Sequence, residues 1–158
     1  MKVLILGATG PTGGRVLASA LEAGDVVSVL ARRPEALAEV GDRIAVLQGD
    51  ATSVDDVARA VEGRDAVIAA LGRGGSLHAE GLFTGAARAV VKAMNRAGVK
   101  RLVWLSSYGV GETIRTASLP QRLVYRTILR DIYADKAASE RILRAGDLEL
   151  TIVYPTTL

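Results

Sequence analysis

The sequence has no cysteine and a single histidine, and only 4% of its 158 residues are aromatic. Without cysteine, the chain can form neither disulfide bonds nor a reactive thiolate. A metal site needs several ligands, and His78 has no obvious companions of that kind. We therefore expect His78 to be an ordinary loop residue, and we predict no metal site.

Long apolar runs and charge clusters of one sign are also missing. No apolar stretch approaches the roughly 20 residues of a membrane span, and no signal-peptide pattern follows Met1. The net charge is only +3, and the basic residues are scattered rather than interleaved with aromatics on one face. These absences predict a soluble cytoplasmic protein whose partner is a small molecule rather than nucleic acid or a membrane.

What the sequence does contain is a regular alternation of short apolar runs and amphipathic segments. The apolar runs predict strands at Val3–Leu6, Val26–Leu30, Arg43–Gln48, Asp65–Leu71, Lys100–Leu105 and Leu148–Tyr154. Helices are predicted at Pro11–Ala23, Glu35–Val40, Val54–Val61 and Gly81–Ala97, with a loop at 110–120 and an interrupted helical region over Gln121–Ala145. This alternation predicts a single α/β domain over residues 1–158, a doubly wound parallel sheet in a Rossmann-like three-layer αβα sandwich.

The most informative stretch lies between the first predicted strand and the first predicted helix. Gly7, Gly10 and Gly13 have the spacing GxxGxxG there, and Thr9 and Thr12 can add hydroxyl contacts. Glycines let the backbone approach a diphosphate closely, and a helix N-terminus supplies N–H donors and positive potential. A tight turn without a ligand is the alternative. The position directly after an N-terminal strand favours the diphosphate.

The second predicted strand ends in a pair of basic residues, Arg32 and Arg33. Proteins that prefer NAD place Asp or Glu at this point to bind the ribose hydroxyls. A guanidinium instead matches a phosphate with two hydrogen bonds, so the pair favours NADP over NAD. The alternative is that both arginines are solvated surface charges.

Polar or small residues follow three later strands as well. Asp50 can accept a hydrogen bond from an adenine amino group, or it can serve as a turn residue or helix cap. Ala70, Leu71 and Gly72 allow the chain to pass close to the adenosine ribose. Ser106 and Ser107 end the fifth strand, where a hydroxyl can orient a carbonyl or donate to a developing oxyanion. The alternative for the two serines is a simple strand cap.

These residues together resemble the atypical short-chain dehydrogenase/reductase group of NAD(P)-binding Rossmann proteins. The sequence is most similar to the biliverdin reductase B (flavin reductase) and NmrA-like proteins of that group. The stretches that carry the resemblance are Gly7–Gly13, Val29–Arg32, Gly49–Asp50, Asp65–Ile68, Leu105–Ser107 and Val153–Pro155, which cover essentially the whole chain in order.

The resemblance implies a role for each of these positions. It places the diphosphate at Gly7, Thr9, Gly10, Pro11, Thr12 and Gly13, the 2′-phosphate at Arg32 beside Arg33, adenine at Asp50 and Ala51, and its ribose at Leu71 and Gly72. It places the nicotinamide at Ser106 and Ser107, the nicotinamide ribose at Lys136, and a further cofactor contact at Pro155.

The sequence departs from the classical members of the group in its catalytic motif. Those members use Tyr-x-x-x-Lys, but Ile132 lies four residues before Lys136 and Tyr133 lies three before it. Tyr133 and Lys136 can still share one helix face, so the candidate catalytic residues are Ser106, Ser107, Tyr133 and Lys136. Biliverdin reductase B-like members lack the motif and transfer hydride with little side-chain acid catalysis. NmrA-like regulators lack it too and bind the cofactor without turnover.

The expected function is therefore an NADPH-dependent oxidoreductase that passes hydride to a flavin, quinone or similar conjugated acceptor. A non-catalytic NmrA-like NADP sensor and, more weakly, a nucleotide-sugar epimerase or dehydratase are the alternatives. Members of the group continue for several dozen residues beyond the point that corresponds to Leu158. We accordingly expect a C-terminal part that helps to close the substrate pocket to be missing.

Overall fold

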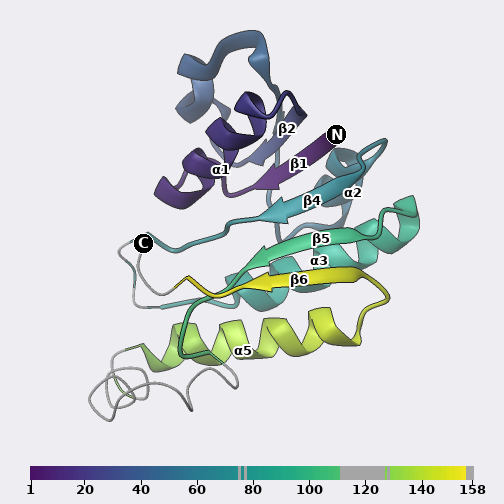
Figure 1. The fold of residues 1–158 in the computed structure, drawn as a ribbon. Helices are drawn as coiled ribbons and strands as arrows, with labels where there is room; N and C mark the ends of the chain where they lie inside the picture. The colour runs from purple at the N-terminus through teal and green to yellow at the C-terminus, as the bar shows by residue number, and fades with distance from the viewer. Residues whose placement is uncertain (75, 77, 111–126, 128, 156–158) are drawn as a thin grey trace.

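Six parallel strands form one sheet in the computed structural model of the protein, which describes residues 1–74, 76, 78–110, 127 and 129–155 (Figure 1). The strands are β1 (Lys2–Leu6), β2 (Val26–Ala31), β3 (Ala45–Gln48), β4 (Ala66–Ala69), β5 (Arg101–Leu105) and β6 (Glu149–Val153). Their order across the sheet is β3-β2-β1-β4-β5-β6. The order reverses at β1, which pairs with β2 on one side and β4 on the other. Ligands of such sheets bind in the crevice at that switch point, at the carboxyl ends of the strands.

Helices cover both faces of the sheet. They are α1 (Pro11–Glu22), the 3₁₀ helix η1 (Pro34–Arg43), α2 (Val54–Val61), α3 (Leu82–Ala97) and α5 (Arg130–Ala145). Because successive side chains of a strand point to opposite faces, Val3 and Ile5 pack in one apolar core with α1 and η1. Leu4 and Leu6 pack in a second core with α2, α3 and α5. The predicted α/β fold, a doubly wound three-layer sandwich, is confirmed.

The segment between β2 and β3 differs from its prediction. The predicted helix over Glu35–Val40 is a 3₁₀ stretch over Pro34–Arg43, interrupted at Gly41, where φ is 62°. A positive φ is readily adopted by glycine, so the backbone turns there and continues in helical geometry. β3 therefore begins at Ala45 and not, as predicted, at Arg43.

The helical region predicted over Gln121–Ala145, before β6, is described mainly in its second half, as α5. α5 begins at Arg130, whereas the helical prediction began at Gln121. Residues 121–126 and 128 lie outside the described residues, as do residues 111–120 of the predicted loop. The other predicted strands and helices agree with the structure to within two residues at each end.

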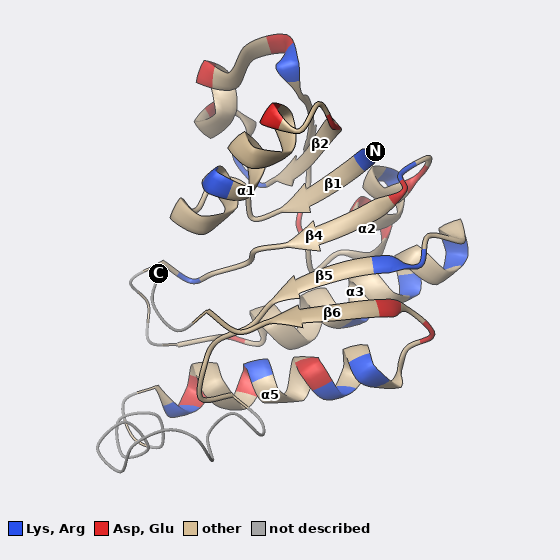
Figure 2. Cartoon of the chain, in the orientation of Figure 1, with Lys and Arg blue, Asp and Glu red and all other residues tan. Residues whose placement is uncertain are grey.

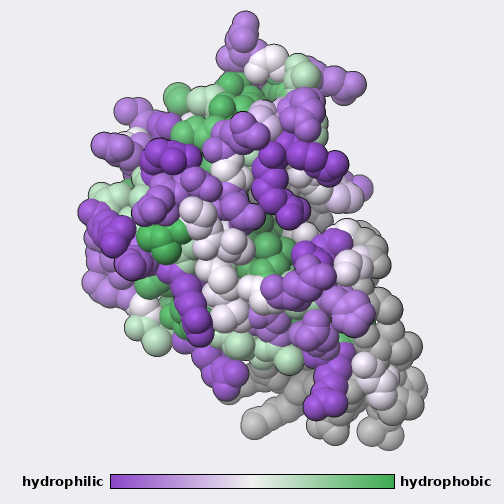
Figure 3. Space-filling view, turned by 180° about the vertical axis from the view of Figure 1, so that it is seen from behind, coloured by the Kyte–Doolittle hydropathy of each residue, from purple (hydrophilic) through white to green (hydrophobic). Residues whose placement is uncertain are grey.

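Charged and apolar side chains are spread over the surface. Basic and acidic residues are interspersed along α5 (Figure 2). The face seen in Figure 3 carries apolar side chains in small groups among hydrophilic ones. Among the described residues, the exposed large apolar side chains are Met1, Val26 and Val153. In the same part of the chain, every helix is too short or too polar to cross a bilayer.

Candidate active site

A pocket of about 840 Å³ opens at the carboxyl ends of the strands, around the switch point beside β1. This volume is in the range of sites that bind small molecules and cofactors. The predicted site residues that line it are Gly7, Thr9, Gly10, Pro11, Thr12, Arg32, Arg33, Asp50, Ala51, Ala70, Leu71, Gly72, Ser106 and Lys136. Those that do not line it are Gly13, Ser107, Tyr133 and Pro155.

The three glycines of the turn after β1 differ in how closely their neighbours approach. Gly7 has a φ of +87°, and a Cβ there would lie 2.5 Å from the carbonyl oxygen of Ala70. A Cβ on Gly13 would lie 2.0 Å from the carbonyl oxygen of Gly7. Gly10 has no such neighbour, since its Cβ would meet nothing closer than 3.5 Å. Gly7 and Gly13 therefore close the turn, whereas the bare backbone of Gly10 leaves space on the pocket side.

The first turn of α1 faces the same space with unused N–H groups. Gly10 is the N-cap and Pro11 the first helical residue, and no side chain among the described residues caps this end. The N-terminal N–H groups of a helix have no partner within the helix and carry a partial positive charge. A phosphate fits this position without any side-chain ligand.

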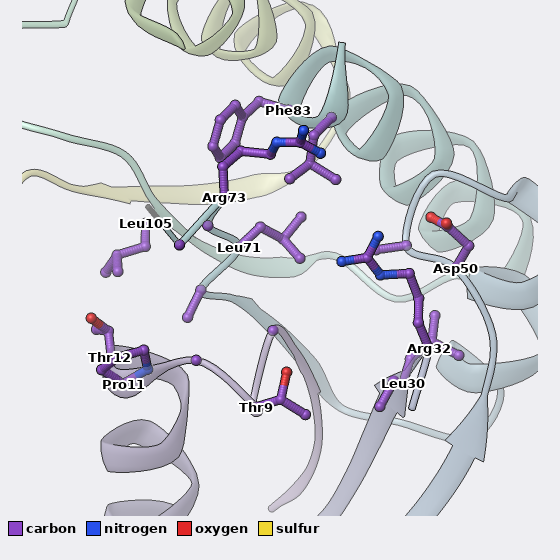
Figure 4. Close-up of a pocket in the computed structure, with 18 of the residues that line it drawn as sticks. Thr9, Pro11, Thr12, Leu30, Arg32, Asp50, Leu71, Arg73, Phe83 and Leu105 are labelled. Carbon is purple, nitrogen blue, oxygen red and sulfur yellow. The ribbon is translucent and has the colours of Figure 1, made fainter. Parts of the chain in front are cut away.

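One end of the pocket is basic. Arg32 and Arg33 are exposed and, within the described part of the chain, form no ion pair. Asp50 lies near Arg32 (Figure 4), and its Oδ1 accepts hydrogen bonds of 2.8 Å from both the N–H and the hydroxyl of Thr52. Asp50 is thus a turn residue that also lines the pocket, so both sequence interpretations of it are compatible with the structure.

The other end of the pocket has mainly apolar side chains, together with Arg73 (Figure 4). Phe83 and Leu105 lie there, separated from Arg32 by Leu71 (Figure 4), and Ile132 of α5 also lines the wall. The Phe83 ring is buried, and the Nζ atom of Lys136 lies 4.8 Å from its centroid. A cation at that distance from an aromatic face is attracted by the ring quadrupole.

Lys136 is the titratable side chain of this apolar end. It is 9% exposed, and its Nζ donates a 2.6 Å hydrogen bond to the Oγ of Ser107. Burial lowers the pKa of Lys136 from 10.5 to about 8, and the charge of Glu140 partly opposes that shift. The ammonium retains two further N–H donors, and Lys136 lines the pocket.

The hydroxyl groups of Ser106 and Tyr133 each donate a hydrogen bond to another group of the protein. The Oγ of Ser106 donates a 2.6 Å hydrogen bond to the Oε1 of Glu140. The hydroxyl of Tyr133 donates a 3.0 Å hydrogen bond to the backbone carbonyl of Tyr108. Pro155 also meets this segment, because its carbonyl accepts from the N–H of Tyr108 at 3.4 Å.

Several pocket residues were not predicted from the sequence. They are Arg15, Leu30, Ala31, Arg73, Gly74, Leu82, Phe83, Leu105 and Ile132. Arg73 is held by its own loop, since its Nε donates to the carbonyl of His78 and its guanidinium pairs with Glu80 at 2.7 Å. His78 is an exposed loop residue, as predicted. No sequence pattern identifies Phe83, because its place depends on how α3 packs against α5.

Two aspartates of α5 accept hydrogen bonds from the backbone at and just before the start of α3, where Phe83 lies. Asp135 accepts hydrogen bonds from the N–H groups of Phe83 and Thr84 at 2.8 and 3.2 Å, and also from the Thr84 hydroxyl. Asp131 accepts from the N–H of Ala79 at 2.6 Å. Because the N-cap of α3 is a glycine without a capping side chain, α5 supplies this cap from a distant part of the sequence.

We expect Asp135→Ala to lower the free energy of unfolding by about 2 kcal/mol, since it removes the cap of α3 and leaves buried N–H groups unpaired. Urea denaturation followed by circular dichroism measures this change. Asp42→Ala is the control, because Asp42 is exposed, and we expect that variant to stay within about 0.5 kcal/mol of wild type. Equal stability of the two variants would contradict the capping role.

The lowered pKa of Lys136 predicts a pH dependence of stability. Between pH 8 and 10.5 the unfolded chain binds more protons at Lys136 than the folded one, so stability rises with pH there. At about 1.4 kcal/mol per pKa unit, we expect a gain of about 3 kcal/mol across that window. Urea unfolding at several pH values, with Lys136→Met as the variant that lacks this gain, measures it. Parallel curves for the two proteins would contradict the burial of the ammonium.

Comparisons with known proteins agree with this geometry. A family model described as NAD(P)H-binding matches residues 7–158. YhfK of Bacillus subtilis, described as an uncharacterized sugar epimerase, is 30% identical, and the alignment covers 98% of this chain and 71% of YhfK. The structure of the oxidoreductase YlbE of Lactococcus lactis superposes with a TM-score of 0.81 at 25% identity, over 98% of this chain and 68% of YlbE.

A second solved structure has the same fold. ChuY of Escherichia coli O157:H7, described as an anaerobillin reductase, superposes with a TM-score of 0.79 at 24% identity, over 98% of this chain and 72% of ChuY. The resemblance to NAD(P)-binding Rossmann proteins, predicted from the glycine turn and the strand ends, is confirmed. The match over nearly the whole chain, together with the uncapped glycine turn at the switch point, establishes that the protein belongs to the NAD(P)H-binding family of Rossmann-fold proteins.

Proposed function

We propose that the protein is an NADPH-dependent reductase that transfers hydride to a flavin, a quinone or a similar conjugated small molecule. The observation that carries the proposal is the polarity of the pocket. Arg32 and Arg33 form its basic end, and Lys136 lies beside the apolar wall at the other end. NADPH supplies the hydride, and the residues of the chain bind and orient the reactants.

The basic end supports NADP rather than NAD as the cofactor. The space beside Gly10 and the open N–H groups of α1 suit a diphosphate. Arg32 follows β2 where an NAD-binding protein would carry an acid for the ribose hydroxyls. A guanidinium there attracts a 2′-phosphate, and no carboxylate follows β2 directly to repel it.

The apolar end supports a flat, conjugated acceptor. Leu105 and Ile132, which are half-buried, offer apolar surface on which a planar ring system can lie, next to the buried ring of Phe83. Lys136 brings one positive charge to this wall, and its pKa of about 8 suits proton donation near neutral pH. A conjugated acceptor spreads the charge that it gains with the hydride, so it needs less help from an acid than an isolated carbonyl does.

A sugar epimerase, the description given to YhfK, is less favoured. Enzymes of that kind rely on a tyrosine four residues before the lysine, and Ile132 occupies that position. The hydroxyl of Tyr133 donates a hydrogen bond to the carbonyl of Tyr108, and Tyr133 does not line the pocket. A non-catalytic NADP sensor would use the same basic end and would bind the cofactor without turnover.

The test is NADPH consumption by the purified protein in the presence of FMN, a quinone or an enone, followed by absorbance at the nicotinamide band. We expect turnover with at least one acceptor and faster turnover with NADPH than with NADH. Reactions without protein serve as controls, since reduced nicotinamides react slowly with some quinones. Tight NADPH binding with no turnover in any mixture would contradict the reductase function and favour the non-catalytic NADP sensor.

A further inference from the structure

We propose that Glu140 is a positioning residue of the candidate active site, where its buried carboxylate fixes the Ser106 hydroxyl and stabilises the Lys136 ammonium. The inference rests on the proposed reductase function and adds a residue to it, because Glu140 does not line the pocket. It also gives the two neighbouring serines different roles.

The geometry consists of two side-chain pairs that join α5 to the end of β5. Glu140 lies four residues after Lys136, so both side chains lie on one face of the helix. Ser106 and Ser107 follow β5 directly. The distance from the Ser106 Oγ to the Glu140 Oε1 is 2.6 Å, and that from the Lys136 Nζ to the Ser107 Oγ is also 2.6 Å. Ser106 therefore meets Glu140, and Ser107 meets Lys136.

The direction of these hydrogen bonds distinguishes the serines. Ser106 donates its only hydroxyl proton to Glu140, so it can only accept a further hydrogen bond. Ser107 accepts from Lys136 and still has its own proton to donate. Ser106 is the serine that lines the pocket, and the site therefore presents to a ligand one acceptor, Ser106, beside one cationic donor, Lys136.

Glu140 itself is held at both carboxylate oxygens. Its Oε2 accepts a 2.7 Å hydrogen bond from the hydroxyl of Tyr154, which follows β6. Arg144, one turn further along α5, is 3.7 Å from the same oxygen and donates to the Tyr154 hydroxyl at 3.0 Å. The Glu140 side chain is 7% exposed and that of Arg144 is 60% exposed, so water screens the Arg144 charge far more. The carboxylate is thus held in place by Ser106 and Tyr154, one helical turn from Lys136.

Glu140 is the charged group that acts on Lys136, while Arg73, which lines the same pocket, is paired with Glu80 at 2.7 Å. From α3, Lys136 meets the ring of Phe83, while the charged residues Arg88, Lys92 and Arg96 of that helix are exposed. Asp135 on α5 accepts hydrogen bonds from the N-terminus of α3. From β5 and β6 the polar groups are Ser106, Ser107 and Tyr154. Burial lowers the pKa of Lys136, and Glu140 is the group whose charge raises it.

The experiment measures the titration of Lys136 in the full chain and does not depend on turnover. Acetic anhydride labels neutral amines, and mass spectrometry of the Lys136 peptide gives the labelling rate at each pH. We expect a pKa of about 8 in wild type and a lower pKa in Glu140→Gln, because the variant loses the opposing charge. Glu149→Gln is the matched control, since Glu149 is exposed and begins β6 at the end away from Tyr154.

Circular dichroism establishes that each variant is folded. If Glu140→Gln does not fold, Glu140→Met takes its place, because it removes the charge without burying an amide. A Lys136 titration that is the same in the neutral variant as in wild type would overturn the role of Glu140, even if stability falls. A shifted titration in a protein without reductase activity would instead contradict the proposed function alone.

Where turnover is measured, the pH profile provides a second readout. We expect the profile of Glu140→Gln to move to lower pH together with the Lys136 titration, while Glu149→Gln keeps the wild-type profile. A residue that only joined α5 to β6 would lower the yield of folded protein and leave the profile in place. Reductase activity whose profile does not move would contradict the proposal for Glu140 and leave the reductase function intact.

Discussion

Replacing Gly13 with alanine is expected to weaken NADPH binding by about a hundredfold or more and to lower the free energy of unfolding by at least about 3 kcal/mol. The added Cβ would lie 2.0 Å from the carbonyl oxygen of Gly7 and 2.9 Å from the Cα of Ala8. Both are backbone atoms of the turn that receives the diphosphate, so the clash can be relieved only by moving that turn. Titration of NADPH by fluorescence and urea denaturation measure the two effects.

The neighbouring glycine supplies the control for this substitution. A Cβ on Gly14 would lie 3.6 Å from the carbonyl oxygen of Ala8, which is an ordinary contact. Gly14 lies within α1, where alanine is the better helix former, so Gly14→Ala should raise stability by about 0.5–1 kcal/mol. If Gly13→Ala is as well tolerated as Gly14→Ala, the close packing of the turn is refuted.

Replacing Arg32 with alanine is expected to weaken NADP binding by about a hundredfold and to change NAD binding by less than about threefold. A charge-assisted, two-pronged contact with a phosphate contributes about 2–3 kcal/mol, and NAD lacks that phosphate. Isothermal titration with the two cofactors gives the two ratios directly. The preference for NADP should therefore disappear in the variant.

Two further arginine variants make this result specific. Arg43→Ala removes an exposed arginine at the end of η1, outside the pocket lining, and should leave both affinities unchanged. Arg33→Ala tests the neighbouring guanidinium, which also lines the pocket. Equal losses for NADP and NAD in Arg32→Ala would contradict the recognition of the 2′-phosphate.

Much of the fold could be predicted from the sequence because its signals are local. Runs such as Val3–Leu6 read as strands since parallel strands buried on both faces are continuously apolar. The glycine turn was recognisable because its backbone needs small residues at fixed positions. The 3₁₀ geometry of η1 was missed, since a single glycine, Gly41, decides where that segment turns.

Site residues that directly follow a strand could be predicted from the sequence, whereas those brought in by the packing of two helices could not. Arg32, Asp50 and Ser106 each follow a strand and were found in this way. Phe83 came into the site through the packing of α3 on α5, which no local pattern encodes. Glu140 had a usable signal, because it lies four residues after Lys136 on a predicted helix.

The polarity of the pocket is tested most directly by a crystal structure of the intact chain with NADP bound. We predict that the 2′-phosphate lies within hydrogen-bonding distance of the Arg32 guanidinium, with the diphosphate over Gly10 and the first turn of α1. The nicotinamide should lie at the Phe83 end, next to Ser106 and Lys136. A nicotinamide placed at the Arg32 end, or a 2′-phosphate without contact to either Arg32 or Arg33, would contradict the proposed site.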